Sequence, residues 1–296
     1  MDISKLTLAP SKSTASTKIV YGSDDKLFGC IERNQRSSTL SSTSFGTFLD
    51  AGTGSHSLRW MASLLHPSAK TALSIDEFTA VTADEGMRQN VLKEAKSLEI
   101  DSKGSIVIGN WAERGKDELC KGQTFDTILC DYLVGAMDGF SPYYQDEIFP
   151  QLVEHLNPGG RIYVVGLNPV PDEAEGDANI ICKATKVRDA CILLAGHRCY
   201  REYPLEWIER HLERSGLEVV ATSQFPILYS HNAIVRQLNV ARSKLKLFPN
   251  QKLAKEMGET INFLEQESLK ATSKAPAGRI KLGFDYVVTA QLPLKK

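Results

Sequence analysis

A turn with two glycines follows a short apolar run and is the segment of the chain best suited to bind a ligand. The apolar run ends at Asp50, and the chain continues as Ala51, Gly52, Thr53 and Gly54 before a helical pattern begins. Glycine has no Cβ, so a ligand can lie directly against the backbone of such a turn. Its N–H groups, with a helix N-terminus behind them, can bind an anionic group such as a carboxylate. A strand, a tight turn and a helix in this order are typical of nucleotide-like ligand sites in parallel α/β sheets.

Polar residues stand at the ends of the next three apolar runs as well. These residues are Asp84, Asn110 and Asp131. Because ligands of doubly wound sheets lie outside the carboxyl ends of the strands, we expect these side chains to gather beside the glycine turn. A carboxylate at the second strand end can accept two hydrogen bonds from a ribose diol. The amide of Asn110 can bind an adenine edge, and the indole of Trp111 can lie against the ring.

The elements that would position these residues alternate between strand and helix. Strand patterns occupy residues 47–50, 78–83, 105–109, 125–130, 161–167, 217–225 and 284–290. Helical patterns lie between them, at residues 57–65, 87–98, 145–156 and 204–215. This alternation predicts an α/β fold with a doubly wound, mostly parallel sheet.

Two longer segments interrupt the alternation, near residues 168–203 and 230–275. The second has apolar residues at helical spacing and is divided by Pro249, which predicts two helices. We therefore expect one domain over residues 19–296 with two insertions, the second forming a helical cap over the substrate pocket. Residues 1–18 are rich in Ser, Thr and Lys and are expected to form a flexible extension.

Three motifs in chain order resemble those of the class I S-adenosylmethionine-dependent methyltransferases. Residues 49–54 (LDAGTG) are similar to the D-x-G-x-G motif of that family. Residues 125–129 (FDTIL) resemble its fourth-strand F-D-x-I, and residues 156–161 (LNPGGR) its L-x-P-G-G turn before the fifth strand. The resemblance covers residues 45–225, and residues 284–290 match the closing strand of the family. It implies a Rossmann-like, seven-stranded sheet with helices on both faces and an antiparallel last strand.

The resemblance also implies a cofactor, S-adenosyl-L-methionine, with S-adenosyl-L-homocysteine as the product. The implied cofactor-binding residues are Asp50, Ala51, Gly52, Thr53, Gly54, Asp84, Asn110, Trp111, Asp131 and Tyr132. The glycine turn would face the methionine end, Asp84 the ribose hydroxyls, and Asn110 and Trp111 the adenine. Asp131 and Tyr132 would open the floor of the site toward the sulfonium and the substrate.

The chain departs from the family pattern at two positions. His56 stands where many members have a third glycine, so the turn must reach the cofactor differently there. Asn110 stands where many have an aspartate, although an amide can bind the same adenine edge.

Two acids compete for the place at the second strand end. Asp76 lies at the more usual distance from the glycine turn, whereas Asp84 lies at the usual distance from Asn110. We prefer Asp84, because residues 78–83 form a better strand than residues 70–75.

Methyl transfer is an in-line displacement whose rate depends mainly on holding the nucleophile and the methyl carbon in line. A hydroxyl or ammonium nucleophile also loses a proton, so a base within reach helps. The candidate catalytic residues are Asp131, Asp138 and His197. Two of them have a plainer interpretation: Asp138 as a turn residue and His197 as a surface residue.

The expected substrate is a small molecule with an O, N or S nucleophile. The segment after the fourth strand reads CDYL and not the N/D-P-P-Y of amino methyltransferases, and no basic stripe favours nucleic acid. A methyltransferase of protein or RNA and a non-catalytic cofactor-binding protein remain as alternatives. The sequence fits an NAD site less well, because Ser57 stands where the third glycine of the G-x-G-x-x-G motif would be.

Composition sets the remaining expectations. The chain has 296 residues, a net charge of −1 and 42% hydrophobic residues, and no apolar run is long enough to span a membrane. Its six cysteines include no C-x-x-C pair, and its histidines show no metal-ligand spacing, so we expect no metal. The N-terminus lacks the apolar region of a secretory signal, so we expect a cytoplasmic protein, with organelle targeting by the Ser-rich N-terminus as the alternative. Both a monomer and a homodimer are consistent with the sequence.

Overall fold

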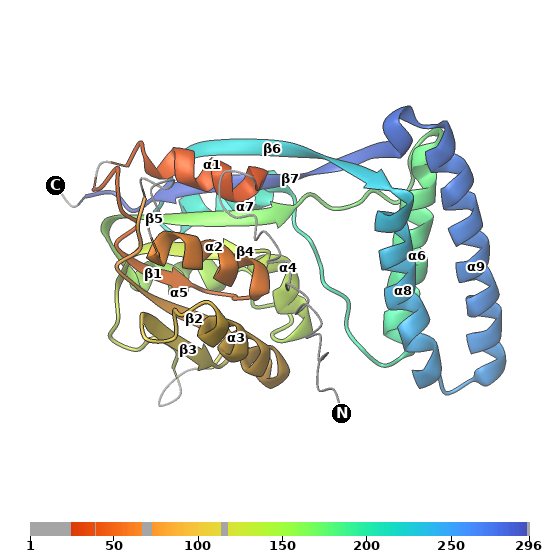
Figure 1. Ribbon diagram of the computed structural model, residues 1–296, viewed down its shortest axis with the longest axis horizontal. Helices are drawn as coiled ribbons and strands as arrows, with labels where there is room; N and C mark the ends of the chain where they lie inside the picture. The colour runs from red at the N-terminus through yellow and green to blue at the C-terminus, as the bar shows by residue number, and fades with distance from the viewer. Residues whose placement is uncertain (1–24, 39, 67–72, 114–117, 295–296) are drawn as a thin grey trace, which may run out of the picture.

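Seven strands in the described part of the chain form a single sheet (Figure 1). The computed structural model describes residues 25–38, 40–66, 73–113 and 118–294, so the predicted extension at residues 1–18 lies outside it. The strands are β1 (Thr47–Asp50), β2 (Glu77–Thr82), β3 (Gly104–Ile108), β4 (Phe125–Asp131), β5 (Leu156–Leu167), β6 (Glu218–Ser230) and β7 (Arg279–Gln291).

The strand order is β3-β2-β1-β4-β5-β7-β6. Strand β7 runs antiparallel to both of its neighbours, β5 and β6, and the remaining strand pairs are parallel. The predicted seven-stranded, mostly parallel sheet with an antiparallel last strand is therefore confirmed. The carboxyl ends of β1, β2, β3, β4, β5 and β6 therefore lie along one edge of this sheet.

Helices cover both faces of the sheet. The helices are α1 (Lys26–Gln35), α2 (Ser55–Leu65), α3 (Glu85–Ser97), α4 (Leu133–Ala136), α5 (Ile148–Glu154), α6 (Asn179–Leu194), α7 (Leu205–Arg214), α8 (His231–Lys244) and α9 (Gln251–Lys274). The first three pack with Phe48 and Leu129 on one face, and α4, α5 and α7 pack with Leu49 and Ile128 on the other. Adjacent strand residues thus point to opposite cores, which explains why these strands read as continuous apolar runs.

The boundaries around the L-x-P-G-G motif differ from the prediction. Helix α5 is shorter than the predicted residues 145–156, and β5 begins at Leu156, before the motif, and not at Arg161. The motif is therefore an irregular start of the strand. The pairing of β4 with β5 shifts register after Phe125, and Gly159 has a φ of +79°, which favours glycine.

Strands β6 and β7 are longer than predicted and extend beyond the sheet. Strand β7 pairs with β5 only from Asp285 to Gln291, whereas its pairing with β6 continues to Arg279 and Ser230. This two-stranded ribbon leads to helices α6, α8 and α9, which stand beside the sheet (Figure 1).

We call α6, α8 and α9 together the helical unit. They share an apolar core of their own that includes Ile181, Leu238 and Ile261. The break between α8 and α9 occurs as predicted, and the side chain of Asn250 accepts hydrogen bonds from the N–H groups at the start of α9. The two predicted insertions thus meet in one bundle. Among the described residues, no helix combines the length and the apolar character that crossing a membrane requires.

Candidate functional site

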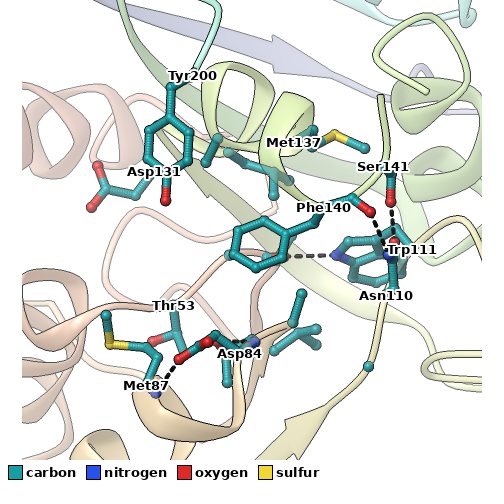
Figure 2. Close-up of a pocket in the computed structure, with 18 residues that line it drawn as sticks. Thr53, Asp84, Met87, Asn110, Trp111, Asp131, Met137, Phe140, Ser141 and Tyr200 are labelled. Carbon is teal, nitrogen blue, oxygen red and sulfur yellow. Dashed lines mark hydrogen bonds between the residues drawn. The ribbon is translucent and has the colours of Figure 1, made fainter. Parts of the chain in front are cut away.

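A cavity of about 320 Å³ lies at the carboxyl ends of β1, β2 and β4, and we call it the strand-end pocket (Figure 2). The predicted residues that line it are Ala51, Gly52, Thr53, Asp84, Asn110, Trp111 and Asp131. Three further predicted residues, Asp50, Gly54 and Tyr132, are not among its lining residues.

Asp50 lies beneath the glycine turn and stabilises it. Its side chain is fully buried, and one carboxylate oxygen accepts a 2.6 Å hydrogen bond from the hydroxyl of Ser57. Burial raises the pKa of Asp50 to about 6, although the bond from Ser57 acts in the opposite direction. Asp50 is therefore a positioning residue, and its predicted direct role toward a ligand is not what the structure shows.

The N–H groups of the turn are mostly used within the protein. Those of Ala51 and Thr53 donate to carbonyl groups of neighbouring strands over 2.9 and 2.7 Å. Those of Gly52 and Gly54 make longer bonds, of 3.4 and 3.3 Å, to Asp50 and Ser57. Ala51 and Thr53 thus use their N–H groups within the sheet, and the predicted binding of an anion by this turn remains a prediction for the N–H groups of Gly52 and Gly54.

Gly52 and Gly54 serve the packing and the start of a helix. A Cβ at residue 52 would lie 2.8 Å from the side chain of Leu133, so glycine lets α4 approach the turn. Gly54 is the N-cap of α2 and has extended backbone.

Asp84 lies at the rim of the strand-end pocket and caps α3. One carboxylate oxygen accepts a 2.5 Å hydrogen bond from the N–H of Met87, and the side chain is exposed. The competing acid, Asp76, comes before β2, where it accepts a 3.2 Å bond from Ser44. Asp76 is therefore at the opposite edge of the sheet, and of the two acids only Asp84 lines the pocket.

Trp111 and Asn110 form the far wall of the pocket. The indole of Trp111 is 4% exposed and donates a 2.7 Å hydrogen bond to the carbonyl of Ala51. The amide of Asn110 donates to the carbonyl of Phe140 over 3.1 Å and accepts a hydrogen bond from the Ser141 hydroxyl. Asn110 thus holds the loop after α4, so its amide is already in use within the protein.

Asp131 is half-buried at the end of β4 and lines the same pocket. Burial and the nearby carboxylate of Asp50 raise its pKa to about 7. Tyr132 follows in a left-handed conformation, with a φ of +51°. Its hydroxyl donates a 2.9 Å hydrogen bond to Asp285 of β7, which places its polar end away from the predicted position over the pocket floor.

A second, larger cavity of about 940 Å³ lies between the sheet edge and the helical unit. Its lining comes from the loops after β4, β5 and α6, and from α6, α8 and β6. Phe140 and Tyr200 line both this helical-unit cavity and the strand-end pocket. Figure 2 shows the ring of Phe140 between Tyr200 and Asp84. The two cavities are therefore neighbours that share a wall of two aromatic rings.

The three predicted catalytic residues are not brought together. Only Asp131 lines the strand-end pocket, and His197 lines the helical-unit cavity, where its Nδ1 lies 3.0 Å from the ammonium of Lys244. Asp138 lines neither cavity. It is 4% exposed and lies 3.2 Å from Arg198 and 4.0 Å from Arg201, so it is an ion-pairing residue and its predicted role as a base is not supported.

Glu202 is a candidate acid or base that the sequence analysis missed. It lines the helical-unit cavity, and its carboxylate packs against Gly135 of α4, where a Cβ would collide with it. Burial raises the pKa of Glu202 to about 7, although the nearby Arg188 opposes this shift. Its segment, between two helical patterns and rich in Arg and Tyr, carries no motif, so only the high density of polar side chains could have indicated it.

The described residues contain no group of three or more His, Cys, Asp or Glu side chains arranged to hold a metal ion.

Known structures share this fold, whereas no family model matches the sequence and no curated protein is similar to it. A protein of Bacillus halodurans C-125, classed provisionally as a methyltransferase, is 14% identical with a TM-score of 0.53. The match covers 89% of this chain and 98% of that one. The YcgJ protein of Bacillus subtilis is 14% identical with a TM-score of 0.51, over 90% of this chain and 98% of that one. The chain therefore shares the fold of these two structures, which agrees with the Rossmann-like α/β fold expected from its three motifs.

Proposed function

We propose that the protein is an S-adenosylmethionine-dependent methyltransferase that acts on an O, N or S nucleophile of a small molecule. The observation that carries the proposal is the pairing of two cavities. The strand-end pocket has the shape and polarity for the cofactor, and a larger cavity meets it across Phe140 and Tyr200. A methyl acceptor in the larger cavity would lie next to the cofactor site.

The residues of the strand-end pocket fit S-adenosylmethionine. The carboxylate of Asp84 lies at its rim and can accept hydrogen bonds from the ribose hydroxyls. The buried indole of Trp111 gives the adenine an apolar surface. The pKa of Asp131 is raised to about 7, and the positive charge of the cofactor would favour its ionised form. When bound, the cofactor supplies a methyl group on a positively charged sulfur.

Phe140 and Tyr200 would align the acceptor and keep water from the reacting atoms. Their rings are 43% and 58% exposed in the present structure, so a bound acceptor would bury apolar area against them. Holding two reactants at near contact is the main source of rate in a displacement that needs no covalent help from the protein.

Glu202 would take the proton that the nucleophile loses. Its carboxylate lies in the helical-unit cavity beside α4, the helix that follows Asp131 at the end of β4. A base is most effective when its pKa lies near the working pH, and the raised pKa of Glu202 meets this condition. We therefore propose Glu202 as the base beside the predicted candidates Asp131, Asp138 and His197.

The size of the helical-unit cavity supports a small acceptor. Its volume of about 940 Å³ lies within the range typical of sites for drug-sized molecules. Helices α6 and α8 of the helical unit contribute to its lining, which supports the proposed cap over the substrate pocket.

Transfer of labelled methyl groups to a metabolite extract tests the proposal. The purified protein is incubated with methyl-labelled S-adenosylmethionine and the small-molecule, protein and RNA fractions of a cell extract in separate reactions. We expect label in the small-molecule fraction, and its loss with the Asp84→Ala variant but not with Asp76→Ala. Label that appears only in the protein or RNA fraction, or in none, would contradict the proposal.

A further inference from the structure

The helical-unit cavity carries more positive than negative charge, although the chain as a whole has a net charge of −1. The cationic residues that line it are Arg188, Arg198, Arg201 and Lys244, and the acidic ones are Asp189 and Glu202. Such an imbalance concentrates anions in a cavity with apolar walls.

The protein itself balances only some of these cations. Arg188 forms a 2.7 Å ion pair with Asp189, which neutralises both. Arg198 and Arg201 share a single carboxylate, that of Asp138, at 3.2 and 4.0 Å. Glu202 stands on the same loop, so Asp138 and the ionised Glu202 together balance these two arginines.

Lys244 is then the cation of this lining that no acid balances. It is half-buried at the end of α8, and its ammonium lies 3.0 Å from Nδ1 of His197. An ammonium has only donors, so in this contact it donates to Nδ1. The partner of Lys244 thus fixes its position without balancing its charge.

The cavity combines charged and apolar side chains. Glu202 lies against Gly135 of α4, and Lys244 of α8 contacts His197 of the loop after α6. Apolar side chains also line the cavity, among them Leu167, Ile192 and Val240. A molecule that fills this cavity meets a proton acceptor beside α4 and the ammonium of Lys244 on α8.

We infer that the methyl acceptor is an amphipathic anion, with its nucleophile toward Glu202, an apolar body, and one anionic group held by Lys244 and Arg201. This inference rests on the proposed function for the role of the molecule, but the recognition of an anion by this cavity can be measured separately. The anionic group is a carboxylate or a phosphate, since both accept hydrogen bonds from ammonium and guanidinium groups.

Two fluorescent probes that differ only in an anionic group test the inference. They are 8-anilinonaphthalene-1-sulfonate and its neutral counterpart N-phenyl-1-naphthylamine, titrated into the full-length protein with saturating S-adenosylhomocysteine present to fill the strand-end pocket. We expect saturable binding of the sulfonate, about tenfold or more tighter than that of the neutral probe, as one charge-assisted contact predicts. Equal affinity for the two probes would overturn the inference.

Variants locate the anion site. We expect Lys244→Met and Arg201→Met each to lower the affinity for the sulfonate probe several-fold and to leave the affinity for the neutral probe unchanged. Lys246→Met is the matched control, because Lys246 is exposed two positions along the chain and does not line the cavity. A loss of sulfonate binding that is the same in the control and in both test variants would contradict the assigned site.

Competition distinguishes the two anionic groups. Octanoate and octyl phosphate are used to displace the bound sulfonate probe, with 1-octanol as the neutral control. Displacement by octanoate identifies a carboxylate site, displacement by octyl phosphate alone identifies a phosphate site, and equal displacement by octanol overturns the inference. A separate calorimetric titration with S-adenosylhomocysteine keeps the two proposals apart: if this ligand binds while the anionic preference is missing, only the inference on the acceptor fails.

Discussion

The hydroxyl of Ser57 donates a 2.6 Å hydrogen bond to the buried carboxylate of Asp50. This bond ties the last residue of β1 to the first turn of α2, across the glycine turn that borders the strand-end pocket. Asp50, the acid of the D-x-G-x-G motif, thus affects the pocket by holding the glycine turn in its conformation.

Removing this donor should destabilise the fold. We expect Ser57→Ala to lower the free energy of unfolding by about 1–3 kcal/mol, because a buried carboxylate loses a hydrogen-bond partner. Urea denaturation measures the change, with Ser55→Ala on the same helical turn as the control. Equal stability of the two variants would show that the bond to Asp50 does not hold the turn.

Because the pKa of Asp50 is raised in the folded state, the free energy of unfolding should depend on pH. Below about pH 4 the residue is protonated in both the folded and the unfolded chain, so it contributes nothing. Between pH 4 and pH 6 the unfolded chain ionises first, because the pKa in the folded state is about 6 against 3.8 in the unfolded state. The free energy of unfolding therefore falls as the pH rises, by about 3 kcal/mol from this group.

Asp50→Asn isolates this contribution, because an amide can still accept the bond from Ser57. We expect the stability of the variant relative to the native protein to increase as the pH rises from 4 to 7. Urea denaturation at several pH values measures the difference, and Asp146→Asn at an exposed position is the control. A difference that stays constant with pH would contradict the burial of a charged Asp50.

Glu202 should control the proton transfer and leave cofactor binding intact. We expect Glu202→Gln to lower the rate of methyl transfer by about 10²–10⁴-fold, as the loss of a general base predicts. In the native protein we expect the rate of methyl transfer to rise as the pH passes about 7, because Glu202 ionises there. This rise should be absent from the Glu202→Gln variant. Gly135→Ala should have a similar effect, because a Cβ there displaces the carboxylate of Glu202.

Rates from pH 5 to 9 and calorimetry with S-adenosylhomocysteine measure both effects of the Glu202 variants. Glu206→Gln, on the exposed side of α7, is the matched control. If the Gln variant at residue 202 keeps the native pH profile, Glu202 is not the base.

The helical unit should be separable from cofactor binding. Leu238 is fully buried in its core, so Leu238→Ala should lower the free energy of unfolding by about 2–5 kcal/mol. No described residue of α6, α8 or α9 lines the strand-end pocket, so the affinity for S-adenosylhomocysteine should not change. Thermal denaturation and calorimetry measure the two quantities, with Leu269→Ala, half-exposed on α9, as the control. A parallel loss of affinity would show that the two parts are coupled.

The sheet and its ligand edge could be predicted because their signals are local. Each strand is a short apolar run, and its carboxyl end is marked by a polar residue such as Asp84 or Asp131. The ribbon of β6 and β7 was predicted too short, because no residue of β6 is buried and Pro226 and Gly283 interrupt the strand pattern.

The catalytic side of the site could not be read from the sequence, since it depends on contacts between distant segments. Asp138 forms ion pairs because a loop about 60 positions away brings two arginines to it, which argues against its predicted role as a base. Glu202 is proposed as the base because that loop packs against Gly135. No spacing rule predicts either contact.

Calorimetric titration with S-adenosylhomocysteine tests the central claim most directly, because it measures the strand-end pocket without knowledge of the acceptor. We predict saturable binding to the native protein and about 10–100-fold weaker binding to Asp84→Ala, as the loss of charge-assisted hydrogen bonds to a ribose diol requires. Asp76→Ala, at the other edge of the sheet, should bind as the native protein does. Absence of saturable binding to the native protein, together with tight binding of NAD, would contradict the account.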